Sequence, residues 1–174
     1  TKNYLGFTVK GGANYNFNEH HNAFFNVGYI SRAPKFNYGA FLSFASSNVT
    51  NPDAKNEKVV SFELGYGYRL KWLQVDVNAY WTKWLDKTMA KSSTVGTAQV
   101  DAFVNMTGVN ALHKGIEIEA KASPLYWLDV NAMFSIGDWK WDSNAKGYVF
   151  DYNGQPLTKD GSIASGIGAE DHLS

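Results

Sequence analysis

Residues 59–81 read VVSFELGYGYRLKWLQVDVNAYW, and their side chains alternate between apolar and polar. A period of two is typical of a β-strand with two different faces, so this stretch predicts two strands. The break at Lys71-Trp72 fits a two-residue hairpin loop. In the register that this loop sets, apolar side chains face apolar side chains in every rung: Leu70 opposite Leu73, Tyr68 opposite Val75 and Tyr66 opposite Val77.

The apolar faces of this hairpin run for roughly 9 to 11 residues, the length that a tilted strand needs to cross a bilayer. Strands of soluble sandwiches are shorter, with a mode of about 5 to 6 residues. The opposite face carries small residues and charges of both signs, which suits a water-filled lumen. Because a free strand edge finds no hydrogen-bond partner in lipid, a membrane-crossing sheet must close into a barrel.

Four further segments carry the same alternation, and we expect strands over 4–17, 23–32, 103–123 and 128–137. Short turns follow the first, third and fifth strands, whereas long connections at 34–58, 88–101 and 139–174 follow the second, fourth and sixth. Outer-membrane barrels show this asymmetry, with short periplasmic turns and long extracellular loops. The predicted fold class is therefore all-β, an antiparallel up-and-down segment of a transmembrane β-barrel with about six strands.

Two groups of side chains follow from this arrangement. The polar face, which a barrel directs into its lumen, carries the charged and amide residues Glu63, Arg69, Asp76, Asn78, Glu117, Glu119 and Lys121. Aromatic residues near the strand ends predict two girdles at the membrane interfaces, with Trp72, Tyr126 and Trp127 at the short turns and Trp81, Trp84, Trp139 and Trp141 at the other ends.

Composition excludes several classes of function. The 16 basic and 16 acidic residues balance without a basic block, so a nucleic-acid partner is not expected. No apolar run is long enough for a transmembrane helix, and the lack of Cys excludes disulfides, Cys-based zinc sites and Cys nucleophiles. The chain has neither an initial Met nor a signal peptide, and we expect residues 1–174 to be part of a longer protein.

The sequence offers little chemistry. Glu117 and Glu119 share a face without a pocket, and we interpret them as neighbouring lumen charges that pair with Lys121 or with a partner on the adjacent strand, so no enzyme activity, metal or cofactor is predicted. We interpret His20-His21 as a solvated turn and Asp151 to Gly154 as a hairpin turn instead of a calcium loop. The candidates for ligand contact are aromatic residues of the long connections: Phe36, Tyr38, Phe41, Phe44, Tyr148, Phe150 and Tyr152. Loop packing and contact with a surface lipoprotein are the alternative interpretations of these residues.

Several stretches, in this order and spacing, resemble the C-terminal half of the barrel in TonB-dependent outer-membrane receptors. They are YISRAPKF at 29–36, NEK at 56–58 before FELGY at 62–66, AYWTKWLDK at 79–87, and GIEIEA at 115–120 before Pro124. The resemblance covers the chain up to about Trp141. It implies a barrel of roughly 22 strands in the bacterial outer membrane.

The resemblance further implies import of a scarce nutrient through a barrel that an N-terminal plug fills and an inner-membrane TonB complex drives. Residues 1–174 would form a partial barrel domain without the plug, so the expected partners are outer-membrane lipid, the rest of the barrel, the plug and, through the plug, TonB. Iron chelates, cobalamin, glycans and peptides all stay open as substrates. Two alternatives are a secreted or surface β-sandwich that binds carbohydrate and a small passive outer-membrane barrel.

Overall fold

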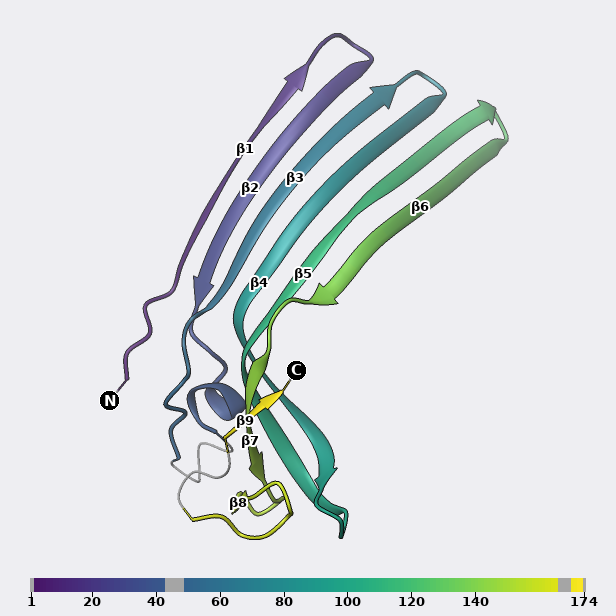
Figure 1. Ribbon diagram of the computed structural model, residues 1–174. Helices are drawn as coiled ribbons and strands as arrows, with labels where there is room; N and C mark the ends of the chain where they lie inside the picture. Colours follow the sequence, from purple (N-terminus) through teal and green to yellow (C-terminus); the bar gives the residue numbers. More distant parts are fainter. Residues whose placement is uncertain (1, 43–48, 166–169, 174) are drawn as a thin grey trace.

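The computed structural model describes residues 2–42, 49–165 and 170–173, and these form one antiparallel sheet of nine strands (Figure 1). Along the chain the strands pair as β1-β2-β3-β4-β5, after which β5 pairs with both β6 and β7, and β7 with β8 and β9. The bounds are β1 Phe7–Asn16, β2 His21–Arg32, β3 Glu57–Arg69, β4 Leu73–Val95, β5 Val100–Leu125, β6 Leu128–Trp141, β7 Ala145–Phe150, β8 Pro156–Leu157 and β9 Glu170–Leu173. A hydrogen-bonded turn, η1, spans Phe36–Ala40, and Asn37 and Tyr38 within it have non-helical backbones.

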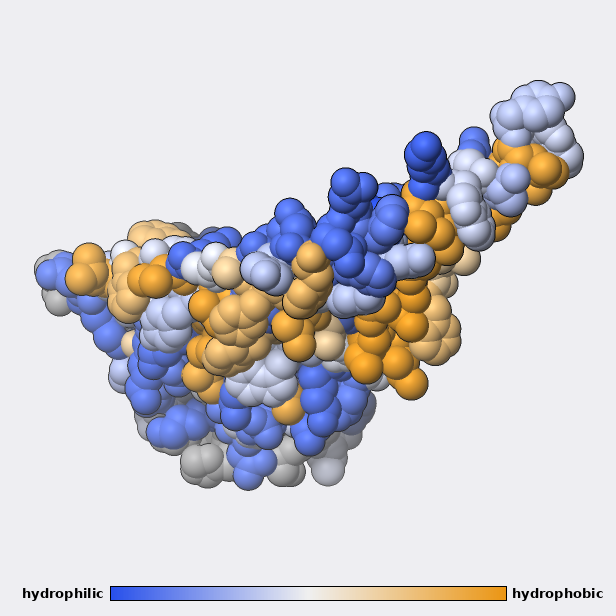
Figure 2. Space-filling model, turned by 90° about the horizontal axis from the view of Figure 1, so that it is seen from above, coloured by the Kyte–Doolittle hydropathy of each residue, from blue (hydrophilic) through white to orange (hydrophobic). Residues whose placement is uncertain are grey.

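The central hairpin has the predicted register. Tyr68 lies opposite Val75, Tyr66 opposite Val77, and the Leu70 amide donates to the Leu73 carbonyl oxygen at 2.6 Å. The apolar face has no second layer over it, because Phe62 is 46% and Leu64 60% exposed. Figure 2, viewed from the short-turn end, shows hydrophilic residues on one side of the sheet and hydrophobic residues on the other. The β-sandwich alternative is therefore wrong for the described residues, which form a single sheet.

The predicted connection over 88–101 is wrong, because β4 and β5 continue as a hairpin and residues 96–99 alone form its turn. Two bulges hide this extension from the sequence pattern: the β4–β5 register shifts between Trp84 and Lys87 and again between Lys87 and Met89. Asp86 (φ 56°) and Gly108 (φ 80°) have left-handed backbones beside these shifts. An extra residue in one strand reverses the faces beyond it, so the alternation of the two strands no longer matches.

The predicted connection over 139–174 also contains strands. Trp139 to Trp141 belong to β6, and β7 then takes the place of β6 beside β5 by pairing with Phe103 to Thr107. Ser143 fixes this change of partner, since its hydroxyl accepts from the Asn110 amide at 2.8 Å and donates to the Gly108 carbonyl oxygen at 3.0 Å.

The described sheet is open. β1 pairs with β2 alone and β6 with β5 alone, and Figure 1 shows these two strands on opposite sides of the sheet. A small barrel closed by these strands, the second alternative, does not form. The sheet is instead a segment of a barrel wall, as predicted. We use the term wall for β1 to β3, β6 and the parts of β4 and β5 that pair with β3 and β6.

Candidate functional site

The polar face of the wall carries an acidic group around Asn78. Asn78 lies directly opposite Glu117 on β5, and its amide donates to Glu63 Oε1 at 2.8 Å. The other oxygen of Glu63 accepts from the Asn26 amide at 2.9 Å. These side chains line a hollow of about 700 Å³ to which Lys10, Ser61 and Thr82 also contribute.

Nearer the short turns, the charged side chains of the same face form hydrogen bonds and ion pairs. Arg69 donates to Asn22 at 2.5 Å and to Asp76 at 3.3 Å, and Lys121 pairs with Glu119 at 2.9 Å. The cross-strand partners place all seven residues predicted for this face on it. This ion pair confirms Lys121 as the partner of Glu119, whereas Glu117 forms no ion pair within the described residues.

Two aromatic rings on the polar face lie over glycines of neighbouring strands. A Cβ at Gly65 would clash with the Phe24 ring, and one at Gly115 would lie 2.7 Å from the Tyr80 hydroxyl oxygen. The Trp139 indole N–H donates to that hydroxyl at 2.9 Å. In the sequence, such a contact corresponds to a glycine directly opposite an aromatic residue on the neighbouring strand. It can be recognised only once the register of the two strands is known.

Three of the four tryptophans predicted for the girdle at the loop end do not face outward. One rung of the sheet joins Val59, Trp84, Ala111 and Trp141, which puts Trp84 and Trp141 on the polar face, and Trp139 lies there with Tyr80. Trp81 alone occupies the apolar face, with its ring 5.6 Å from that of Phe62. The prediction used distance from the strand end without the period of two, which decides the face.

The loop end of the molecule has a small buried core. Leu42, Tyr148 and Phe150 pack together, and each is at most 2% exposed. The Tyr148 hydroxyl donates to Asp53 Oδ2 at 2.5 Å, and the Asn105 amide donates to the Leu42 carbonyl oxygen at 2.5 Å. Tyr148 and Phe150, both candidates for ligand contact, are therefore used for loop packing.

A row of aromatic rings lies beside this core. Tyr38 in η1 is 5.9 Å from Phe103 of β5, whose ring is 4.4 Å from that of Tyr152. Tyr38 has a left-handed backbone (φ 59°), which is unusual for a bulky residue, and burial raises the pKa of its hydroxyl. Phe36 and Phe41 form a separate pair 5.0 Å apart, and Phe44 lies outside the described residues. Phe103 was not predicted as a candidate, because the candidates were taken from the long connections and Phe103 was expected at the start of a wall strand.

A buried carboxylate ties the wall to the loop end. Glu57, at the start of β3, is 1% exposed and accepts from Arg32 Nε at 2.8 Å and Arg32 Nη2 at 2.6 Å. Its other oxygen accepts from the Thr88 amide at 3.3 Å. Because Thr88 lies beyond the bulge of β4, this one side chain joins β2, β3 and the extended hairpin.

The search for clustered metal ligands covers the described side chains. In residues 2–42 and 49–165, no three His, Asp or Glu side chains gather as a metal site, and no helix there is long and apolar enough to cross a membrane. His20 Nδ1 lies 2.9 Å from the Arg69 carbonyl oxygen, and His21 contacts the Tyr66 hydroxyl. His20 thus lies in the first short turn, and His21 begins β2 directly after it.

A comparison with models of known protein families identifies the family of the chain. Residues 1–169 match the family model described as TonB dependent receptor-like, beta-barrel. The chain belongs to this family. Comparisons with curated proteins and with solved structures give no match.

TonB-dependent receptors are outer-membrane transport barrels, and this membership agrees with the all-β wall. In the complete receptors of the family the barrel works with a plug and with TonB, and members act as transporters. The wall of this chain has one exposed apolar face and one polar face.

Proposed function

We propose that the chain contributes wall strands and substrate-facing loops to a transporter that imports a scarce nutrient across the bacterial outer membrane. The loop end with η1 and β7 is extracellular, and the three short turns are periplasmic. The observation that carries the proposal is the division of one wall between an exposed apolar face and a hollowed polar face with Glu63, Asn78 and Glu117.

The acidic group around Asn78 faces the plug of the complete receptor. Asn78 and Asn26 already occupy both oxygens of Glu63, while Glu117 forms no ion pair within the described residues. A carboxylate shielded from bulk water gains most from a nearby positive charge. We therefore expect a basic side chain of the plug at Glu117.

The substrate meets the row formed by Tyr38, Phe103 and Tyr152. Aromatic faces favour ligands with a ring or a planar surface, such as sugars and aromatic iron chelates. Tyr152 is 54% and Phe36 68% exposed, so both offer surface to a ligand. A surface lipoprotein that delivers the substrate would contact the same loop end.

Uptake by cells tests the proposal. A strain that lacks its own receptor and carries the full-length protein is given four labelled probes: ferric citrate, cyanocobalamin, maltoheptaose and an oligopeptide. We expect uptake of one probe and a reduction of about tenfold on Tyr152→Ala, through loss of ring stacking. Tyr126→Ala, at a short turn on the opposite end, is the matched control and leaves uptake unchanged. Failure to import any of the probes, or equal losses in both variants, would contradict the proposal.

A further inference from the structure

A cluster of charged side chains lies on the apolar face near the loop end. Side chains two residues apart share a face, so Lys83 follows Trp81 outward. In one rung Lys83 lies opposite Leu112 and Leu112 opposite Lys140, and in the rung below Trp81 lies opposite Lys114. We use the term charged patch for five residues on this face and at its margin: Lys83, Lys114, Lys140, Asp138 and Asp142.

The patch has more positive than negative groups. Lys83 pairs with Asp142 at 2.7 Å and Lys114 with Asp138 at 3.4 Å, whereas Lys140 forms no ion pair among the residues that the structure describes. The hydrogen bond from Lys83 lowers the pKa of Asp142, and the charges of Lys83 and Lys140 add to this effect. Three ammonium groups thus stand against two carboxylates, and the Lys83 and Lys114 side chains are 33% and 50% exposed.

The depth of the patch follows from the rungs. Along the apolar face of β4, Leu73, Val75, Val77 and Ala79 precede Trp81, and Trp is enriched where the apolar core of a bilayer meets the headgroups. Lys83 lies one rung farther out, at headgroup level. The two ends of the wall differ here, because the corresponding rung near the short turns holds Leu73, Ala122 and Val130.

We propose that the charged patch binds a phosphate-bearing lipid headgroup of the outer leaflet. The inference rests on the proposed function, which places the loop end outside the cell. Lys is a strongly hydrated point charge that binds phosphate without a fixed geometry, as an exposed lipid site requires. Directly below the lysines, Ile116, Phe134 and Ile136 are 45%, 60% and 61% exposed and offer the acyl chains an apolar surface. This juxtaposition favours a lipid over a soluble phosphate.

Binding of a diphosphorylated lipid A to the full-length receptor in neutral detergent tests this proposal by native mass spectrometry. The triple variant Lys83→Gln, Lys114→Gln and Lys140→Gln is expected to lose about fivefold in affinity for each lysine. The control variant Lys10→Gln and Lys121→Gln removes two positive charges from the polar face and leaves binding unchanged. Equal losses in both variants would show attraction by net charge and overturn the proposal.

Further variants separate the chemistry. Asp138→Asn with Asp142→Asn frees two lysines and raises the affinity about threefold, whereas a loss would indicate a bridging cation and overturn direct contact between lysine and phosphate. Dephosphorylated lipid A binds more weakly, and millimolar inorganic phosphate competes poorly; full competition would overturn the choice of a lipid. Lys140→Gln breaks no ion pair and keeps the test valid if the triple variant does not fold.

Nutrient uptake, measured in parallel, separates this inference from the proposed function. A receptor that imports a probe without binding the lipid overturns the lipid site alone. A receptor that binds the lipid through the patch without importing any probe overturns the transport proposal alone.

Discussion

The wall and the loop end of this molecule are stabilised in opposite ways. In the wall, large apolar side chains such as Leu64 and Ile136 are 60% and 61% exposed, and polar side chains cover the other face. At the loop end, Tyr148 and Phe150 are 2% exposed and pack around Leu42, as in a soluble domain. The difference indicates two solvents, since lipid replaces a protein core along the wall whereas the loops must build a core of their own in water.

The comparison also explains where buried polar groups occur. Asn51, Glu57 and Asn105 are at most 1% exposed, and all three lie at the loop end or at its junction with the wall. Each has a hydrogen-bond partner from a distant part of the chain: Asn51 donates to Thr107 at 3.0 Å, and Asn105 to the Leu42 carbonyl oxygen at 2.5 Å. Such bonds specify one arrangement of segments that come from distant parts of the chain.

A charge placed on each face of the wall tests the division between the two faces, and the most severe loss of stability is expected on the apolar one. Val77 is the middle residue of the apolar face of β4, and Asn78 follows it on the polar face. Val77→Arg should lower the free energy of unfolding by about 2 to 4 kcal/mol, because an arginine at mid-depth meets hydrocarbon. Asn78→Arg, next to Glu63 and Glu117, should be tolerated. Denaturant titration of the receptor in lipid vesicles measures both, and equal losses would contradict the assignment of faces.

The junction of wall and loops gives the next effect. Glu57→Ala removes the acceptor of Arg32 and Thr88 and should destabilise the loop end by about 2 kcal/mol, less than for a fully buried pair because the Arg32 side chain is 52% exposed. Limited proteolysis of the hairpin beyond Thr88 measures this opening. Lys58→Ala, which removes a partly exposed pair with Asp86 at 3.1 Å, is the control and should change little. Uniform destabilisation of wall and loops by Glu57→Ala would argue against a junction.

A smaller effect is expected inside the loop core. Tyr148→Phe keeps the packing with Leu42 and removes the hydrogen bond to Asp53, which should cost about 1 kcal/mol. Hydrogen exchange of β7 amides measures the loss. Tyr152→Phe changes an exposed ring and should leave exchange as it is. If both variants gave the same protection, the Tyr148 hydroxyl would have no part in holding the loops.

Sequence periodicity predicted the wall because each face of a strand there stays in a single environment along its length, so apolar and polar residues alternate regularly. The register at Tyr66 and Val77 and the faces of Glu63 and Glu117 follow from alternation and from one short turn. Beyond Trp84 the pattern fails, since bulges at Asp86 and Gly108 reverse the faces and the strands pass for a loop. Local alternation contains no information about such shifts.

The candidate site shows the same limit. Tyr148, Phe150 and Tyr152 alternate as a strand should, yet alternation does not show that Leu42, more than a hundred residues earlier, covers the first two. Phe103 was missed because the two rings beside it, Tyr38 and Tyr152, come from distant segments of the chain and cannot be placed there from the sequence. Sequence therefore indicates which residue types the loops offer, and long-range packing decides which of them stay exposed.

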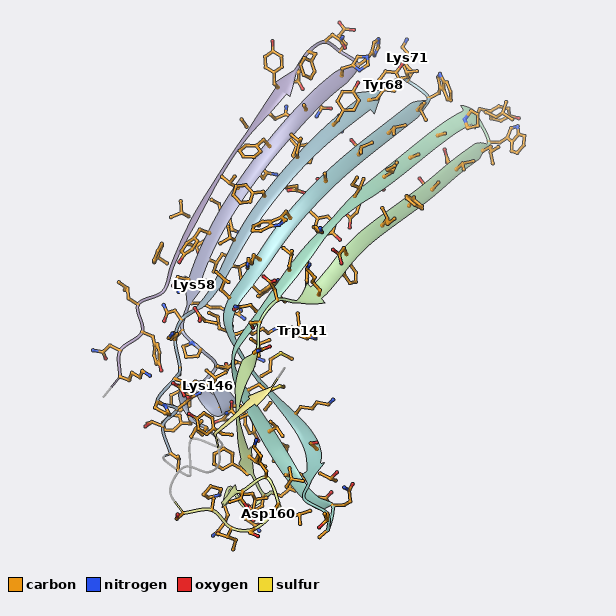
Figure 3. The ribbon with its side chains drawn as sticks, viewed as in Figure 1. Lys58, Tyr68, Lys71, Trp141, Lys146 and Asp160 are labelled. Atoms are coloured by element: carbon orange, nitrogen blue, oxygen red, sulfur yellow. The ribbon has the colours of Figure 1, made fainter. Side chains whose placement is uncertain are left out.

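At the far tip of the loops, a single carboxylate holds a turn together. Asp160, labelled in Figure 3, accepts from the Thr158 hydroxyl and, at 3.1 Å, from the Ser162 amide. These bonds hold its pKa below the ordinary value, so the folded turn favours the charged carboxylate. The resulting stabilisation is present at neutral pH and is lost as the pH falls through the lowered pKa of the folded state.

Hydrogen exchange of the Ser162 amide, divided by its intrinsic rate at each pH, measures this effect. Protection should be present at pH 7 and decline toward pH 3, two pH values that bracket the ordinary pKa range of an Asp carboxyl. Asp160→Asn shares the intrinsic pH dependence and should show weak protection that does not change with pH. Wall amides such as that of Val77 should stay protected in both proteins, because their ladder bonds involve no titrating group. A parallel decline at Val77 would mean that acid loosens the whole sheet, and the tip and the wall would then form one cooperative unit instead of two.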